Sequence, residues 1–277
     1  MIDYRFYRKY RVNSLLKLAY VVILPLLLFM TGGSIGAQDS DSVYRTGAQP
    51  FTPEIQKHMA AKVILVKERR KPSAILPTQV KNWRHLPVVR SQQLNNCGAF
   101  SPSYYYKTYQ EAREHGWLAP DPMVNPERVM SPGFTYPLTN NGKDEGANVY
   151  TVLETISRNG IAPWSVMPET LNYLNYPDEE AWRAAIPYRG RDIFSFDTKT
   201  VAGQAALKEH LAAGDPAVMT ALLYYDTFEH YGSGEELTGV DSDVVYGAGT
   251  VVWDWHAFTV IGYDDAKVYS VGGQEKM

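Results

Sequence analysis

Residues 88–101 read Val-Val-Arg-Ser-Gln-Gln-Leu-Asn-Asn-Cys-Gly-Ala-Phe-Ser, and they contain Cys97, the only cysteine of the 277-residue chain. This polar turn leads into residues 104–116, an aromatic-rich segment with the pattern of a helix that ends at Gly116. A thiol at a helix N-terminus lies near unpaired N–H groups and the positive end of the helix dipole, and both favour the thiolate. A lone cysteine is about equally often a small buried apolar residue, so position alone leaves both interpretations open.

A second stretch, residues 251–265, supplies a candidate base. It is rich in β-branched and aromatic residues and ends in a turn signal, which predicts a strand. In that strand His256 shares a face with Phe258 and Val260. Alone, such a histidine is more often a core residue. Paired with Cys97, its imidazole can take the thiol proton and later protonate a leaving amine.

Together these stretches resemble the papain-like cysteine peptidases, in particular a secreted prokaryotic branch. The family pattern Val-Arg-Asp-Gln, a short turn and Cys-x-Ala-Phe appears as residues 89–92 and 97–100, and the Leu-Ser-Pro-x-Phe-x-Tyr element as residues 130–136. Residues 82–84, Asn-Trp-Arg, resemble the start of the mature enzyme, and residues 256–264 resemble the histidine strand. The resemblance implies an α+β fold with two lobes, one helical and one an antiparallel β lobe, and an active-site cleft between them.

The resemblance also implies roles for four residues. Cys97 is the nucleophile, His256 the base and then the acid, and Gln92 donates, with the Cys97 N–H, to the developing oxyanion. Gly146 offers backbone groups to the substrate, although an ordinary loop glycine fits that position as well. Two departures stand out: Gln92 lies five residues before Cys97 where the family has six, and Glu145 replaces the first glycine of a pair.

Local sequence rules and the family resemblance place the start of the helix near Cys97 at different residues. Ser101-Pro102 is the better local start, since serine is a good N-cap and proline suits the first turn. In a helix that begins at Cys97, Pro102 removes an interior hydrogen bond at a cost of about 3 kcal/mol or a kink. The family resemblance places the start at Cys97, and we follow it.

The chain divides into three segments. Residues 1–37 have the features of a secretory signal: a basic start, an uncharged run from Leu18 to Met30, and small residues up to Ala37. That run is shorter than the ~20 residues of a membrane span, although an uncleaved anchor is the alternative. Residues 38–76 are a solvated linker or a short propeptide, with a basic cluster at residues 67–71. Residues 77–277 form the peptidase domain, and a secreted or periplasmic location follows.

Composition excludes several classes of function. The net charge of −3 provides no basic excess for nucleic acid, and no residue cluster has metal-ligand or phosphate-loop spacing. We therefore expect peptide or protein substrates, no cofactor, no metal, and membrane contact only through the N-terminal segment. Further helices are expected at residues 149–159, 179–185 and 203–213, followed by a strand at residues 217–224.

One expected element is missing. In the family an asparagine, usually in Asn-Ser-Trp-Gly, follows the histidine strand and orients the imidazole, whereas this chain has no asparagine after Asn175. We expect a C-terminally incomplete domain with weakened activity, in which Gln274 or Asp264 is a substitute orienter. Two rival functions fit: an inactive peptide-binding relative, and another exported Cys/His acyl-transfer peptidase.

Overall fold

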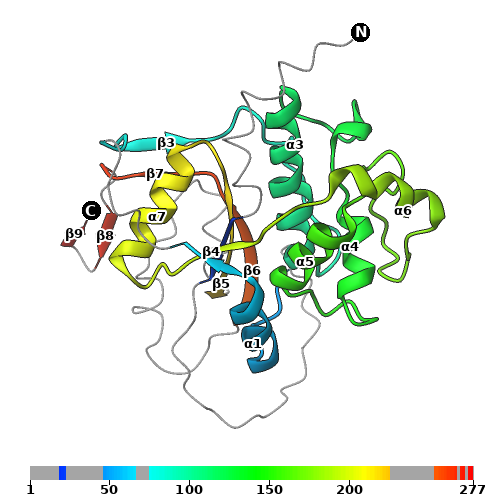
Figure 1. The fold of residues 1–277 in the computed structure, drawn as a ribbon, viewed down its shortest axis with the longest axis horizontal. Helices are drawn as coiled ribbons and strands as arrows, with labels where there is room; N and C mark the ends of the chain where they lie inside the picture. Colours follow the sequence, from blue (N-terminus) through cyan, green and yellow to red (C-terminus); the bar gives the residue numbers. More distant parts are fainter. Residues whose placement is uncertain are drawn as a thin grey trace.

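The computed structural model describes residues 19–22, 46–66, 75–224, 253–266, 269–271 and 274–276. The predicted leader lies outside these residues except for Ala19–Val22, and so does the basic cluster at residues 67–71. Helices α3 to α6 gather on one side of the molecule, and the strands lie with α7 on the other (Figure 1). No helix among the described residues combines the length and apolarity needed to cross a bilayer.

The nucleophile helix begins at Cys97, as the family resemblance predicts. It runs through α2 (Cys97–Phe100), a π-helical segment η2 (Ser101–Lys107) and α3 (Thr108–His115), and it ends at Gly116 with φ +72°. The π segment explains how Pro102 is tolerated, because wider i→i+5 pairing accommodates a residue that has no N–H to give. The local rule that favoured a start at Ser101 is overridden by this change of helix type.

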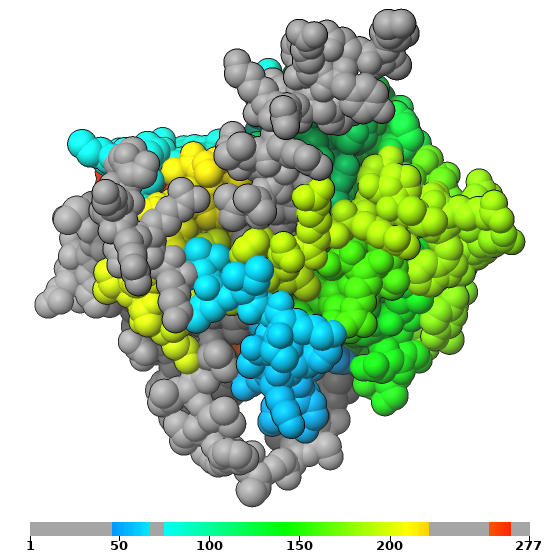
Figure 2. Space-filling view, viewed as in Figure 1, coloured from blue at the N-terminus to red at the C-terminus, as the bar shows by residue number. Residues whose placement is uncertain are grey.

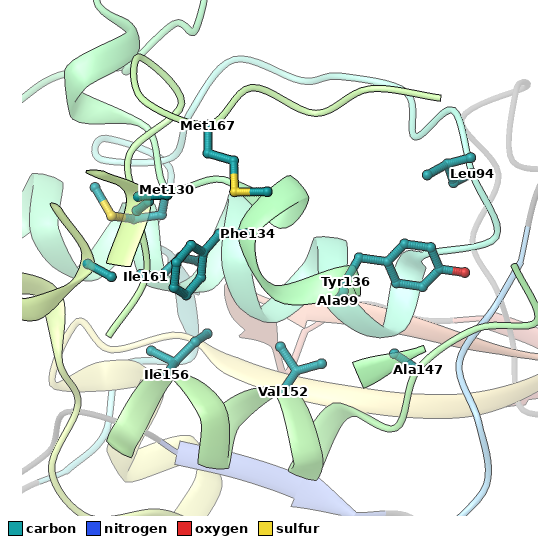
Figure 3. Close-up of a cluster of buried hydrophobic side chains, with 13 residues drawn as sticks. Leu94, Ala99, Met130, Phe134, Tyr136, Ala147, Val152, Ile156, Ile161 and Met167 are labelled. Atoms are coloured by element: carbon teal, nitrogen blue, oxygen red, sulfur yellow. The ribbon is translucent and has the colours of Figure 1, made fainter. Parts of the chain in front are cut away.

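Three further helices complete this side: α4 (Pro132–Thr139), α5 (Val149–Asn159) and α6 (Glu179–Ala185), with single 3-10 turns at Pro126–Arg128 and Ile186–Tyr188. Each helix has a side-chain N-cap, from Ser131, Asn148 and Asp178 respectively. Between them lies a dry cluster that includes Phe134, Val152 and Ile156, each fully buried (Figure 3). This cluster fixes α4 and α5 against α2, which carries Cys97.

The main sheet has the strand order β2-β4-β1-β5-β6. Its strands are β1 (Ala19–Val22), β2 (Ile64–Leu65), β4 (Phe194–Phe196), β5 (Ala217–Tyr224) and β6 (Trp253–Val260). The predicted strand with His256 is β6, and it pairs antiparallel with β5. The pairs β2–β4, β4–β1 and β1–β5 are parallel. The sheet is therefore mixed, because β1 and β2, from segments before the domain, join it in parallel.

Smaller elements surround this sheet. Strands β3 (Gln79–Lys81) and β7 (Gly262–Asp264) form one antiparallel pair, and β8 (Tyr269–Val271) and β9 (Gln274–Lys276) form another. Helix α7 (Val201–Ala212) begins two residues earlier than predicted, because the side chain of Thr200 caps it. It lies between β4 and β5 in the chain, and its Ala206 packs with Phe196 and Ala217.

Residues 46–66 are packed onto the domain. They include α1 (Pro53–Lys62), whose Ile55 and Met59 contact a buried cluster that contains Cys97 and Leu153. His58 Nε2 lies 2.9 Å from Glu154 Oε1 on α5. Figure 2 shows this segment, in blue, spread over the face of the molecule beside the green helices. These contacts join residues 46–66 to the buried core of the folded chain.

Candidate active site

Three of the four predicted site residues line one cavity of about 400 Å³: Cys97, His256 and Gln92. They come from three separate elements, the start of α2, strand β6 and the loop before α2. The remainder of the lining is mainly apolar and includes Phe100, Phe258 and Ile261. The fourth predicted residue, Gly146, is outside this lining and lies against residues 46–49.

Cys97 is the first residue of α2 and is only 1% exposed. The backbone of Asn96 starts the helix, since its carbonyl oxygen accepts from the N–H groups of Ala99 (2.8 Å) and Phe100 (2.7 Å). The thiol sulfur lies 4.0 Å from the carbonyl oxygen of Trp255, the residue before His256. The sulfur is therefore at a helix N-terminus and beside the histidine strand, where a thiolate is electrostatically favoured.

Next to the start of α2 lies a partly buried carboxyl group, Glu169, that the sequence did not single out. The side-chain amide of Asn96 donates to Glu169 Oε1 at 2.5 Å. Burial raises the pKa of Glu169, and the hydrogen bond from Asn96 partly offsets this rise. This contact ties the first turn of the nucleophile helix to the loop that follows α5.

His256 stands opposite Ala221 in the β5–β6 register, and its ring packs edge-on against Phe258 with a centroid distance of 4.8 Å. Burial lowers the pKa of His256 to about 4. At neutral pH the imidazole is therefore uncharged and able to accept a proton.

Gln92 directs its amide at a peptide carbonyl, despite a loop one residue shorter than the family pattern. Its Nε2 donates to the carbonyl oxygen of Thr46 at 3.2 Å and to that of Leu94 at 3.0 Å. A donor in this place is what an oxyanion site requires. Here the acceptor belongs to the chain's own N-terminal segment.

Residues 46–49 lie across the site as an extended peptide. The carbonyl oxygen of Gly47 accepts from Ala147 N (2.9 Å) and Gly98 N (3.4 Å). In turn, Ala48 N donates to the Trp255 carbonyl oxygen (3.1 Å) and Gln49 N to the Ala147 carbonyl oxygen (3.0 Å). Ala48 and Ala147 form a parallel β-bridge. Ala48 belongs to the same buried cluster as Cys97, so this segment contributes to the burial of Cys97.

The backbone pairing expected of Gly146 is made by its neighbour Ala147. Gly146 has φ +99°, and a Cβ there would lie 2.4 Å from the Gly47 carbonyl oxygen. The absence of a side chain at Gly146 therefore leaves room for Gly47, and the Gly146 N–H donates to the Tyr136 hydroxyl at 3.3 Å. The contributions of Ala147 and Trp255 come from backbone groups, which have no signature in residue type.

Asp264 and Gln274 are the two candidate substitutes for the family asparagine, and the structure describes the side chain of Asp264 alone. Asp264 lies on β7, where its carboxylate accepts from Gln79 Nε2 and from the backbone N–H of Ala266. It is not among the residues that line the cavity with His256. The side chain of Gln274 lies outside the described residues.

The fold of this chain is similar to that of a solved cysteine protease. No protein-family model matches the sequence, and a search of curated proteins finds no match either. Among solved structures, xylellain, a cysteine protease from Xylella fastidiosa, matches with a TM-score of 0.58 and 16% identity, over 83% of this chain and 84% of that one. A structure from a study of the mite allergens Blo t 1 and Der p 1 matches at TM-score 0.42 and 14% identity, over 79% and 65% of the two chains. The chain therefore has the papain-like fold of the cysteine peptidases.

Proposed function

We propose that the chain is a cysteine peptidase that hydrolyses peptide bonds in peptide or protein substrates. One observation carries the proposal: the groups around Cys97 already hold an extended peptide, residues 46–49, through Gln92, Ala147 and Trp255. A cleft that binds a backbone in this way, beside a thiol and an imidazole, has the parts required for acyl transfer.

In the proposed mechanism the Cys97 thiol gives its proton to His256, and the sulfur attacks the carbonyl carbon of the substrate. The Gln92 amide and the Cys97 N–H stabilise the oxyanion. His256 then protonates the leaving amine, which departs and leaves a thioester on Cys97. Water, deprotonated by His256, hydrolyses the thioester and restores the thiol.

We further propose that residues 46–66 keep the site latent, so that residues 38–76 are a short propeptide rather than a linker. Ala48 packs in the same buried cluster as Cys97, and Ile55 and Met59 of α1 pack against that cluster. Burial also lowers the pKa of His256, so the imidazole stays uncharged at neutral pH. Substrate enters only after the segment moves or is cut away.

The test uses the full chain with α1 loosened. Met59→Asp removes the apolar contact of a partly buried side chain. Full burial of such a side chain contributes roughly 1.5–3 kcal/mol, so the loss of a partly buried one should raise site opening severalfold. Ala60→Asp, an exposed position on the same helix, is the matched control. We expect Met59→Asp to cleave a fluorogenic peptide faster than the wild type and Ala60→Asp to equal the wild type. Cys97→Ser in the Met59→Asp background is the blank.

A non-catalytic peptide-binding function is the second candidate, and the neutral His256 in a covered site favours it. The two functions separate on the Met59→Asp chain. Rapid alkylation of Cys97 without hydrolysis of any member of a peptide library would support the binding protein, whereas hydrolysis lost in Cys97→Ser supports the peptidase.

We also propose that residues 1–37 direct export, on the basis of their charge and apolar pattern. Expression in a bacterium should give a product outside the cytoplasm, with its new N-terminus near Gln38. N-terminal sequencing that finds Met1 on a membrane-bound product would support the anchor instead.

A further inference from the structure

Gly47 occupies a part of the cleft that has no room for a side chain. A Cβ on Gly47 would lie 1.9 Å from the carbonyl oxygen of Asn95 and 2.2 Å from its carbonyl carbon. Its φ of +132° is also a conformation that L residues rarely adopt. Both the space and the backbone conformation at this position therefore require glycine.

Hydrogen bonds hold Asn95, the residue that excludes a side chain at position 47, in place. Asp144 holds Asn95 twice, since its Oδ1 accepts from Asn95 N and its carbonyl oxygen accepts from Asn95 Nδ2, both at 3.0 Å. The Tyr136 hydroxyl lies 2.7 Å from Asp144 Oδ1 and 3.0 Å from the Asn95 carbonyl oxygen. Asn95 therefore cannot move away from Gly47 without breaking these hydrogen bonds.

Tyr136 also contacts Gly146, on the other side of Gly47. Its hydroxyl accepts from Gly146 N at 3.3 Å, and Gly146 lies against the carbonyl group of Gly47. Figure 3 shows the hydroxyl at the end of the buried cluster where Leu94 and Ala147 lie. Burial, and then the contact with Asp144, raise the pKa of Tyr136, so the hydroxyl stays protonated. The Tyr136 hydroxyl thus bonds both Asn95 and Gly146, and so fixes the spacing between the residues on either side of Gly47.

We propose that Asn95, Tyr136 and Asp144 form a glycine-selective subsite beside Cys97. Peptides that bind along Ala147 in the same direction as residues 46–49 must then carry glycine at the position of Gly47. The inference rests on the proposed function, because it names the peptides that the same cleft accepts. Asn95 and Tyr136 act here as specificity-determining residues and take no part in the chemical steps.

The first experiment measures how firmly the chain's own segment covers the site. We expect Gly47→Ala to raise the rate of Cys97 alkylation by iodoacetamide at least about tenfold, because the new Cβ meets Asn95. Gly142→Ala is the matched control, since Gly142 also has a positive φ, +77°, but no atom within 4 Å of the added Cβ. Gly47→Ala alkylated as slowly as the wild type would overturn the proposal.

The second experiment tests selectivity with added peptides. The probes are an eight-residue peptide with the sequence of residues 44–51 and the same peptide with alanine in place of its glycine. On the Gly47→Ala chain, the glycine peptide should protect Cys97 from alkylation at a concentration at least about tenfold lower than the alanine peptide requires. Met59→Asp replaces Gly47→Ala as the open chain if the latter does not fold.

Two further variants separate selectivity from general stability. Tyr136→Phe keeps the ring and removes the hydroxyl that bonds Asn95 and Gly146, so the preference for the glycine peptide should fall severalfold. Tyr109→Phe is the control, because that hydroxyl bonds the distant Gly214 carbonyl oxygen at 2.8 Å and its loss should leave the preference unchanged. Equal protection by both peptides, or an unchanged preference in Tyr136→Phe, refutes the subsite. Since alkylation needs no hydrolysis, a chain that shows the preference but cleaves nothing contradicts only the proposed function.

Discussion

Replacement of His256 by glutamine should make the chain less sensitive to acid. The pKa of His256 is about 4 in the folded chain because of burial, against an ordinary value of 6.5. The unfolded chain therefore binds the proton more readily between pH 6.5 and pH 4. Stability from this group is fully present above pH 6.5 and is lost as the pH falls through that window.

The size of the effect follows from the two pKa values. Between pH 7.5 and pH 5.0 the wild type should lose about 2 kcal/mol of unfolding free energy through His256 alone. Other groups titrate in the same range, among them His210, whose pKa burial lowers, and Glu169, whose pKa burial raises. They contribute equally to both proteins and cancel when the two losses are subtracted.

The assay is urea unfolding of the wild type and His256→Gln at both pH values, with the slope of each transition checked for two-state behaviour. We expect the acid loss to be about 2 kcal/mol smaller in His256→Gln. Equal losses in the two proteins would mean that His256 is solvated in the folded chain. The inference that burial removes water from His256 would then be wrong.

Two stability predictions follow from the buried groups of the helical side, each checked by urea unfolding. Lys107→Met leaves the buried partner Glu111 without its cation and should cost about 3–5 kcal/mol, whereas Arg183→Met, in an exposed ion pair, should cost less than about 1 kcal/mol; similar costs would refute the argument from burial. Leu153→Ala, at a fully buried position of α5, should cost about 2–5 kcal/mol, and Leu171→Ala, at a 69% exposed position, should stay within about 0.5 kcal/mol. A Leu153→Ala chain as stable as the wild type would contradict the packing described for α1 and α5.

Local signals predicted the elements that carry the chemistry. The turn before Cys97, the helix end at Gly116 and the alternation around His256 are all short-range patterns, and the structure has each element where these patterns put it. The start of the nucleophile helix needed the family resemblance, because Ser101-Pro102 is the stronger local signal. The structure resolves the conflict through a π segment, a change of pairing that no propensity rule describes.

The cover over the site could not be predicted from the sequence. Gly47 is one of 21 glycines in the chain, and nothing beside it marks a contact with Asn95. The bonds to Ala147 and Trp255 use backbone groups, which every residue has. The hydrogen bond between Tyr136 and Asp144 depends on chain segments brought together by folding. Such long-range pairings leave no pattern in a single sequence.

The central claim is that Cys97 attacks a peptide carbonyl with the help of His256. The most direct measurement is mass spectrometry of the acid-quenched Met59→Asp chain after brief mixing with a peptide ester. We expect a mass increase equal to the acyl group, located on Cys97, which is lost in Cys97→Ser and forms much more slowly in His256→Ala. No adduct on a Cys97 that iodoacetamide alkylates rapidly, or an adduct that forms equally fast without His256, would contradict it.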